Sequence, residues 1–212
     1  MTPYFQPSLL DLQEGGEITL GPLDAVRRRP LTQGAWLDLL PGWVAGADGL
    51  FEYLRTEVPW RAEERRMYER VVGVPRLLSF HGEDDPLPHP VLEQARAALS
   101  RHYATELGEP FRTAGLCYYR DGRDSVAWHG DRHGRGSTED TMVAIVSVGE
   151  PRPLLLRPRE GGAGRTLRQT VGHGDLLVMG GSCQRTWEHA VPKTRRPVGP
   201  RISVQFRPRG VS

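Results

Sequence analysis

Arg201-Ile202-Ser203-Val204-Gln205-Phe206-Arg207 is the stretch that decides the fold class of this chain. Apolar and polar residues alternate along it with a period of two, which predicts a β-strand with one face in a hydrophobic core. The opposite face carries Arg201 and Arg207. Because a buried guanidinium is costly without an anion, and because its planar shape suits carboxylates, this face predicts contacts with a carboxylate ligand.

The chain upstream of this strand, from about residue 111, consists of short apolar runs separated by Gly, Pro and charged residues. Such a pattern is typical of strands joined by turns. We expect eight strands, near residues 114–119, 126–131, 141–148, 153–157, 166–171, 175–179, 186–190 and 201–207. Eight short strands favour a double-stranded β-helix, also called a jelly roll.

Residues 1–110 have a different texture, and two helices are expected there. One is expected from Asp48, as its N-cap, to Val58, where Pro59 ends it, and a longer one from Pro90 to about Glu106. We therefore expect an α+β, mainly β, protein. A helical N-terminal part for substrate recognition, residues 1–110, precedes a jelly-roll core over residues 111–212, and both form one structural domain.

Composition limits the functional classes only weakly. The net charge of +2 and the pI of about 8.7 are too mild to argue for a nucleic-acid partner. No run approaches the ~18 apolar residues of a membrane helix, and no basic region followed by an apolar one opens the chain. We expect a cytoplasmic protein without a membrane partner, monomeric, with Cys117 and Cys183 as free thiols.

His129-Gly130-Asp131 provides two candidate metal ligands. In an extended segment, residues two apart point the same way, so His129 and Asp131 project together. His189, in Trp187-Glu188-His189-Ala190-Val191-Pro192, would complete the set from a strand that is distant in sequence. Two imidazoles and one carboxylate hold one face of a metal ion and leave the other open. Together with the arginine face, such a metal suggests a small dicarboxylate that bridges the two.

A second triplet, His173-Gly174-Asp175, competes for the same role. It comes directly before the apolar run Leu176-Leu177-Val178-Met179, where Gly174 and Asp175 indicate a turn that opens a buried strand. The first triplet is therefore the preferred one.

Several motifs, taken in order, cover residues 111–209: Tyr119-Arg120-Asp121-Gly122, His129-Gly130-Asp131, Val146-Ser147-Val148-Gly149, His173-Gly174-Asp175 with Gly180-Gly181, the segment around His189, and the Arg201 strand. This series resembles the Fe(II)- and 2-oxoglutarate-dependent dioxygenases, and within them the AlkB family of oxidative dealkylases. The resemblance implies Fe(II), 2-oxoglutarate and O2 as cofactor and cosubstrates, with the metal on His129, Asp131 and His189.

The resemblance also implies roles for the arginine strand and its neighbours. Arg201 would pair with the distal carboxylate of 2-oxoglutarate, assisted by Tyr119 and Ser203, and Arg207 would lie nearer the metal. The sequence departs from the family where Ser203 and Cys117 stand in place of the usual asparagines.

The substrate implied by the resemblance is an alkylated base in DNA or RNA, demethylated with release of formaldehyde, succinate and CO2. Candidates for the wall of the base pocket are Trp60, Phe80, His81 and Trp128, with His133 where relatives often carry an acidic residue. The aromatic hairpin expected after Val74-Pro75-Arg76-Leu77 is short, and the acidic Glu83-Asp84-Asp85 that follows disfavours phosphates. Two alternatives stay open: the same chemistry on a small metabolite or a protein side chain, and a non-catalytic jelly-roll binding module.

Overall fold

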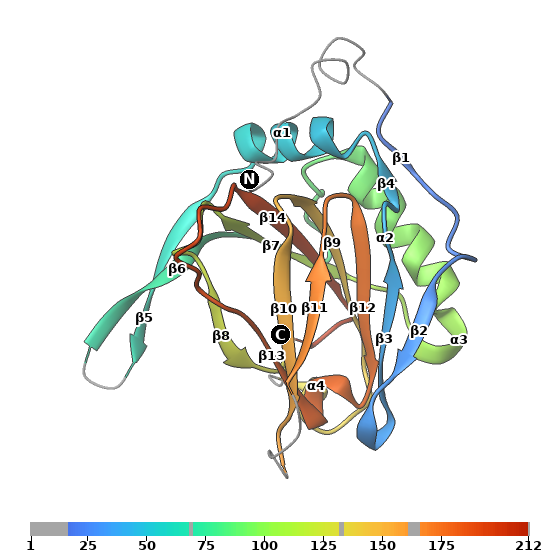
Figure 1. The fold of residues 1–212 in the computed structure, drawn as a ribbon. Helices are drawn as coiled ribbons and strands as arrows, with labels where there is room; N and C mark the ends of the chain where they lie inside the picture. The colour runs from blue at the N-terminus through green and yellow to red at the C-terminus, as the bar shows by residue number, and fades with distance from the viewer. Residues whose placement is uncertain (1–16, 68–69, 132–133, 161–165, 212) are drawn as a thin grey trace.

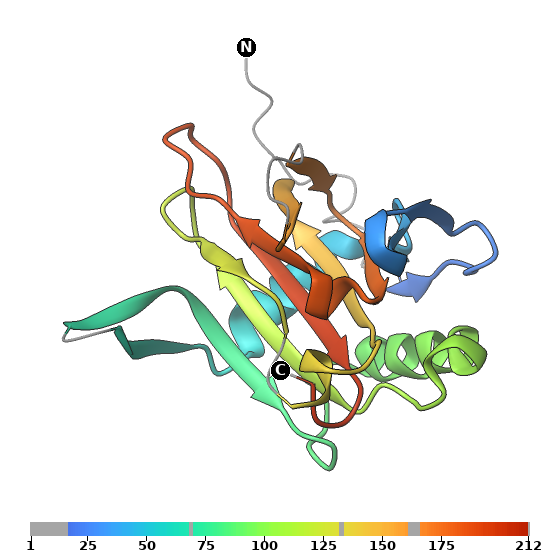
Figure 2. The ribbon, with the colours of Figure 1, turned by 90° about the horizontal axis from the view of Figure 1, so that it is seen from below.

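The structure is a computed structural model, and it describes residues 17–67, 70–131, 134–160 and 166–211. Two β-sheets lie face to face (Figures 1 and 2). The larger sheet has eight strands in the order β2-β3-β12-β9-β14-β7-β6-β5. The smaller sheet has four strands in the order β11-β10-β13-β8, and β1 pairs separately with β4. This arrangement, with helices on one face, is the expected jelly roll.

The strands of the larger sheet are β2 (Arg27–Pro30), β3 (Ala35–Leu40), β12 (Asp175–Gly181), β9 (Val143–Gly149), β14 (Arg201–Arg207), β7 (Thr113–Tyr119), β6 (Arg70–His81) and β5 (Arg61–Met67). The smaller sheet contains β11 (Leu167–Val171), β10 (Arg152–Pro158), β13 (Trp187–Val191) and β8 (Val126–His129). The remaining elements are β1 (Thr19–Leu20), β4 (Val44–Ala45), α1 (Ala47–Glu57), α2 (Pro90–His102), α3 (Ala104–Leu107), α4 (Cys183–Thr186), and the short 3-10 helices η1 (Thr32–Gly34) and η2 (Arg135–Ser137).

Strand β14 lies in the middle of the larger sheet, between β9 and β7, and has the predicted two-faced character. Ile202, Val204 and Phe206 are fully buried in a core that the sheet shares with α1 and α2. Arg201 and Ser203 are also buried, on the opposite face, which looks toward the smaller sheet. The alternation in the sequence thus separates an apolar core from a polar interior between the sheets.

The eight strands predicted after residue 110 are confirmed as β7 to β14, with bounds that differ by a few residues. The helix predicted from Asp48 is α1, but its N-cap is Gly46, and the helix predicted from Pro90 is divided into α2 and α3 at Tyr103.

The expectation of a mainly helical N-terminal part is wrong. Strands β2 and β3 extend one edge of the larger sheet, and β6 and β5 extend the other. The predicted short hairpin after Val74 is also wrong, because β6 continues to His81 and forms a projecting hairpin with the preceding β5 (Figure 1). In the described part of the chain, no helix is both long and apolar enough to cross a membrane.

Candidate metal and cosubstrate site

The structure brings His129, Asp131 and His189 together between the sheets. His129 is the last residue of β8, and the antiparallel register places it directly opposite His189 of β13. One candidate ligand atom from each of the three residues lies within 4.8 Å of the others. Nε2 of His129 is 3.8 Å from Oδ1 of Asp131, and the imidazole centroids are 4.2 Å apart. Strand pairing therefore brings together His129 and His189, which are sixty residues apart in the sequence.

The protonation states of these side chains suit a divalent cation. Nδ1 of His129 lies 2.9 Å from the carbonyl oxygen of Ala127, to which it donates, and this leaves the Nε2 lone pair free. Burial, reinforced by the nearby His129, lowers the pKa of His189 to about 3, so its imidazole is neutral. Burial opposes ionisation of Asp131, but the positive charge of Arg207 and its hydrogen bond to the carboxylate favour it, and the pKa of Asp131 is lowered. Two imidazoles and one carboxylate are a donor set that suits a ferrous ion.

The carboxylate of Asp131 is held by Arg207, which was expected to serve the cosubstrate. Nε of Arg207 donates to Oδ2 of Asp131 over 2.6 Å. The backbone N–H of Asp131 donates to Oε1 of Gln184 over 3.1 Å. Gln184 belongs to α4 and was not predicted as a site residue. Its contact is with a backbone atom of a residue 53 positions away, which no sequence pattern indicates.

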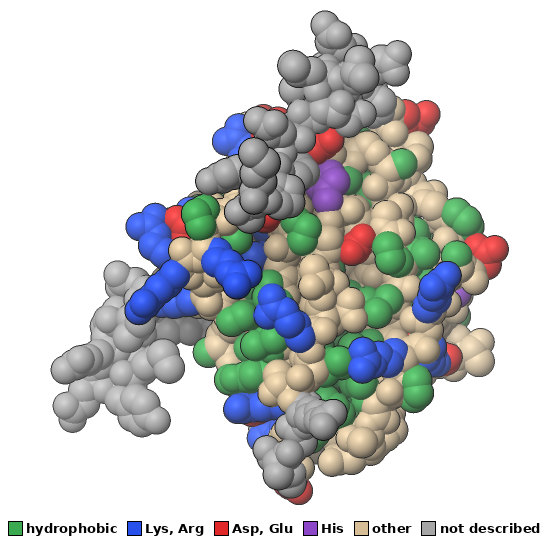
Figure 3. Space-filling model, viewed as in Figure 1, with side chains coloured by type: hydrophobic (Ala, Val, Ile, Leu, Met, Phe, Trp, Pro, Cys, Tyr) green, Lys and Arg blue, Asp and Glu red, His purple; other side chains and the backbone are tan. Residues whose placement is uncertain are grey.

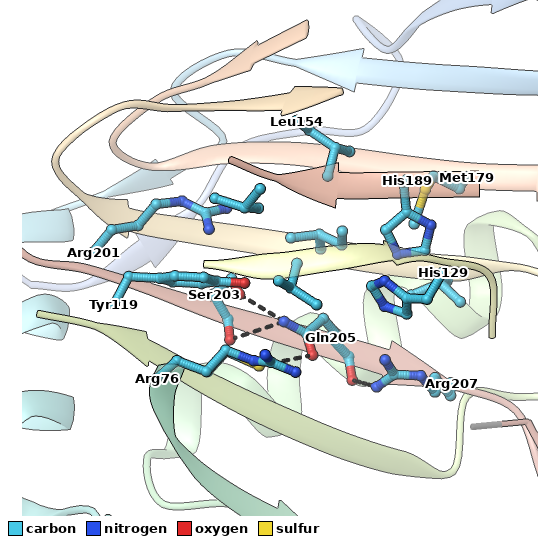
Figure 4. A pocket seen from close by; sticks show the side chains of 15 residues that line it. Arg76, Tyr119, His129, Leu154, Met179, His189, Arg201, Ser203, Gln205 and Arg207 are labelled. Carbon is cyan, nitrogen blue, oxygen red and sulfur yellow. Dashed lines mark hydrogen bonds between the residues drawn. The ribbon is translucent and has the colours of Figure 1, made fainter. Parts of the chain in front are cut away.

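A pocket extends from the two histidines toward Arg201. Figure 4 shows His129, His189 and Arg207 at one end, Arg201 at the other, and Gln205 between them. Apolar side chains from both sheets complete the walls, among them Val143, Ile145, Leu154 and Met179. Such a lining lowers the local dielectric and strengthens any ion pair formed inside.

Arg201 is a buried guanidinium at the far end of this pocket. Its Nε donates to Oγ of Ser147 over 2.9 Å, and its guanidinium lies 5.4 Å from the ring centroid of Tyr119, its partner in the β14–β7 register. No ion pair joins Arg201 to a carboxylate in the part of the chain that the structure describes. Burial lowers the pKa of Arg201 and raises that of Tyr119 to about 12, so the phenol keeps its proton. This end of the pocket therefore suits a carboxylate ligand.

Cys117 and Ser203, the two departures from the family pattern, lie opposite each other on β7 and β14 and both line the pocket. Gln205 connects them. Its Nε2 donates to Oγ of Ser203 over 2.6 Å, and its Oε1 accepts from the thiol of Cys117 at 3.7 Å. An amide group is thus present in the pocket at position 205. This position is two residues further along β14, on the side of the histidines, than position 203, where Ser203 replaces the usual asparagine.

Gln205 and Arg76 are pocket residues that sequence reasoning missed. Gln205 occupies the same face of β14 as Ser203, so its period-two position was an available signal. Arg76 enters from β6, where its Nη1 donates to the carbonyl of Ser125 over 3.1 Å. Arg76 had no such signal, because the neighbouring strand that places it in the pocket was not predicted.

Three of the aromatic residues expected to line a base pocket lie elsewhere. Trp60 packs on Tyr118 in the core beneath α1, and its Nε1 donates to the carbonyl of Leu54. His81 is opposite Ala114, which belongs to the same core. Trp128 lies under the guanidinium of Arg157, 4.2 Å away, and does not line the pocket. Strand alternation explains the positions of His81 and Trp128, which occupy the faces of β6 and β8 opposite to the pocket, whereas Trp60 lies before β5 and packs into the core.

Phe80 lies on the correct face of β6. Its register partner is Gly115 of β7, two residues before Cys117. Its side chain is 66% exposed and does not line the pocket itself. His133, the remaining candidate, lies outside the described residues.

The second triplet has a different role. Nδ1 of His173 accepts from the backbone N–H of Gly149 over 2.8 Å, and Nε2 lies 3.4 Å from the carboxylate of Asp48. The carboxylate of Asp175 accepts from the backbone N–H groups of Gly42 and Gly172. His173 and Asp175 therefore stabilise turns, and the structure supports the preference for the first triplet.

Most carboxylates of the acidic loop after β6 have partners within the protein. Glu83 forms an ion pair with Arg209 at 2.5 Å, and Asp85 accepts from the backbone N–H of Gly82 over 2.8 Å. Two of its three carboxylates are therefore engaged within the protein.

A family model described as the 2OG-Fe(II) oxygenase superfamily matches residues 39–207. The alpha-ketoglutarate-dependent dioxygenase alkB homolog 3 of Bos taurus is 30% identical over 222 residues, covering 95% of this chain and 73% of the relative. The DNA oxidative demethylase ALKBH2 of Mus musculus is 28% identical over 233 residues, covering 95% of each.

Solved structures agree on the fold. The structure of OsALKBH1 superposes with a TM-score of 0.56 at 15% identity, over 85% of this chain and 100% of the other. An oxidoreductase of the 2OG-Fe(II) oxygenase family from Burkholderia pseudomallei has a TM-score of 0.55 at 14% identity, over 81% and 84%. The chain therefore belongs to the 2OG-Fe(II) oxygenase superfamily and, within it, to the AlkB family of dioxygenases, which use Fe(II), 2-oxoglutarate and O2.

Proposed function

We propose that this dioxygenase demethylates N-alkylated bases in DNA or RNA, with Fe(II) bound by His129, Asp131 and His189. One observation carries the proposal. In a chain of the AlkB family, His129 and His189, which form a three-residue ligand set with Asp131, line one end of the pocket, and Arg201, buried without a carboxylate partner in the described chain, lines the other. When bound, iron and 2-oxoglutarate would activate O2: one oxygen atom would enter succinate as 2-oxoglutarate loses CO2, and the other would hydroxylate an N-methyl carbon. The resulting hemiaminal collapses to formaldehyde and the unmodified base.

The protein contributes placement and charge to this reaction. Arg201 would neutralise the distal carboxylate of the cosubstrate, and the protonated hydroxyl of Tyr119 would be available as a hydrogen-bond donor to it. Ser203, Cys117 and Gln205 line the space between this carboxylate and the metal ligands. Arg207 keeps Asp131 ionised and oriented.

A nucleic-acid substrate is supported by the loop between β13 and β14. Lys193, Arg195 and Arg196 are exposed there, directly after the pocket-lining residue Val191. The loop is fixed to the β7–β8 turn because Thr194 donates its backbone N–H to the carbonyl of Gly122. Figure 3 shows further basic side chains on the viewed face, with hydrophobic ones between them. A phosphodiester backbone is the polyanion that such a loop attracts.

The base itself needs a stacking partner, and Phe80 supports this role. It is an exposed aromatic residue on the pocket face of β6, and aromatic rings of this kind stack on bases that have left a duplex or belong to a single strand. The relatives named as DNA oxidative demethylases agree with this class of substrate.

Formaldehyde release from N-methylated single-stranded oligonucleotides, DNA and RNA, tests the proposal, with unmethylated oligonucleotides as controls. His129→Ala should abolish release and 2-oxoglutarate decarboxylation. The matched variant His173→Ala, in the second triplet, should retain both because His173 lies outside the pocket. Decarboxylation without formaldehyde from any methylated oligonucleotide would favour a small metabolite or a protein side chain as substrate. No decarboxylation by the wild-type protein would contradict the enzymatic proposal.

A further inference from the structure

We propose that Gln184 is a positioning residue that holds Asp131 in the geometry required for metal binding. The inference rests on the proposed function, in which Asp131 is a metal ligand. It concerns a residue of α4 that does not line the pocket and whose hydrogen bond is with the backbone of Asp131.

Asp131 needs such support because of its place in the chain. Strand β8 ends at His129, so Asp131 lies two residues beyond the last strand position and outside the ladder with β13. A carboxylate on a loop samples many orientations unless other groups restrain it, and each unrestrained orientation weakens metal binding. Arg207 restrains the carboxylate through Oδ2. The backbone requires a restraint of its own.

Gln184 provides that restraint. Its Oε1 accepts the backbone N–H of Asp131 over 3.1 Å, and its side chain is only 1% exposed. The carbonyl side of Asp131 is confined by Gly136, where a Cβ atom would lie only 2.1 Å from the Asp131 oxygen. The peptide groups on both sides of Asp131 are therefore fixed, one by a hydrogen bond and the other by close packing.

The short helix α4 also connects two of the ligands. It precedes β13 directly, so Gln184 is five residues before His189. Ser182, its N-cap, donates to the carbonyl of Gln33 and lies within hydrogen-bonding distance of Thr186 Oγ1. A single anchored segment thus presents His189 and positions Asp131, although the two ligands are far apart in the sequence.

The NH2 group of the Gln184 side chain also supports a role for this residue in the metal site. Its Nε2 is buried and has no hydrogen-bond partner among the described residues. A buried donor without a partner lowers stability, and an apolar side chain of similar size would avoid that cost. Gln184 can accept a hydrogen bond from the backbone N–H of Asp131, whereas such an apolar side chain cannot.

Binding of Mn²⁺ to the metal-free protein, followed by electron paramagnetic resonance of the free ion, tests the inference without relying on activity. Gln184→Met keeps the length of the side chain but removes the acceptor, and we expect the affinity to fall about 10- to 100-fold. Gln184→Glu retains an acceptor oxygen and should restore most of the loss. Arg185→Ala, an exposed neighbour on α4, is the matched control and should bind as the wild type does. Hydrogen exchange at the Asp131 amide should accelerate in Gln184→Met alone.

The outcomes separate this inference from the proposed function. If Asp131→Ala binds Mn²⁺ as tightly as the wild type, the proposed ligand set is wrong. If Asp131→Ala loses binding while Gln184→Met keeps wild-type affinity, only the positioning role is overturned. An equal loss in Arg185→Ala also overturns it. Should Gln184→Met not fold, Gln184→Glu decides: near wild-type affinity supports the role, and a loss of about tenfold or more contradicts it.

Discussion

Arg207 donates its Nε–H to Oδ2 of Asp131 over 2.6 Å, and the other oxygen of that carboxylate, Oδ1, faces Nε2 of His129 at 3.8 Å. The guanidinium thus occupies one side of the carboxylate and leaves the side toward the histidines for a cation. From the sequence, Arg207 was expected to assist the cosubstrate. In the structure its ion pair is with the candidate metal ligand, which ties the C-terminal strand β14 to the metal end of the pocket.

Substituting Arg207 should make stability depend on the metal. Arg207→Gln leaves the carboxylate of Asp131 buried without its cation, and breaking such a pair costs about 3 to 5 kcal/mol. We expect this loss in urea unfolding of the metal-free protein. Saturating Mn²⁺ should recover much of it because the ion replaces the missing positive charge. An equal loss with and without Mn²⁺ would contradict the arrangement.

Substituting Arg201 should separate stability from cosubstrate binding. Arg201→Met removes a buried charge that has no carboxylate partner in the described chain, so the metal-free protein should be as stable as the wild type or more so. Binding of 2-oxoglutarate, measured by calorimetry, should weaken by about 2 to 5 kcal/mol. Mn²⁺ affinity should stay the same. Unchanged 2-oxoglutarate binding would show that another residue anchors the distal carboxylate.

The buried His189 should make the metal-free protein sensitive to acid. Its pKa is about 3 when folded and 6.5 when unfolded, so between these values the unfolded state binds the extra proton. The stability contribution is complete above pH 6.5 and is lost as the pH falls toward 3. From pH 7 to pH 5, the wild type should lose about 2 kcal/mol more than His189→Asn in urea unfolding. Parallel pH profiles for the two proteins would contradict the shifted pKa.

The basic loop after β13 should contribute to nucleic-acid affinity through charge alone. Replacing Lys193, Arg195 and Arg196 with alanine should weaken binding of single-stranded oligonucleotides and reduce the salt slope of log K by up to about 2. Decarboxylation of 2-oxoglutarate in the absence of substrate should not change. Arg27→Ala with Arg29→Ala, exposed on the edge strand β2, is the matched control. An identical salt slope for the loop variant and the wild type would exclude this surface.

The side chain of Phe80 should affect binding of the substrate and not binding of the cosubstrate. Phe80→Ala removes an exposed ring on the pocket face and should weaken binding of a methylated oligonucleotide by about 1 to 3 kcal/mol, seen as a higher KM. Tyr53→Ala offers a control, since Tyr53 is the other large exposed apolar residue among those that the structure describes and lies on α1. Equal effects of the two substitutions would remove Phe80 from the substrate site.

The sequence by itself determined those features that depend on local periodicity. Alternation along residues 201–207 predicted that Ile202, Val204 and Phe206 enter a core while Arg201 and Ser203 face the other way. The spacing of His129 and Asp131 predicted that they project together, although Asp131 lies just beyond the strand. These predictions succeed because the geometry of an extended chain fixes the direction of each side chain relative to its neighbours.

Only the tertiary structure decided which distant groups meet. The β8–β13 register places His189 opposite His129, and α4 places Gln184 against the backbone of Asp131. Strand β6, which joins the sheet from the N-terminal part of the chain where no strand was predicted, brings Arg76 into the pocket and turns His81 away from it. Such pairings depend on sheet order and register, which follow from packing the whole chain, and no local pattern around any one of these residues contains that information.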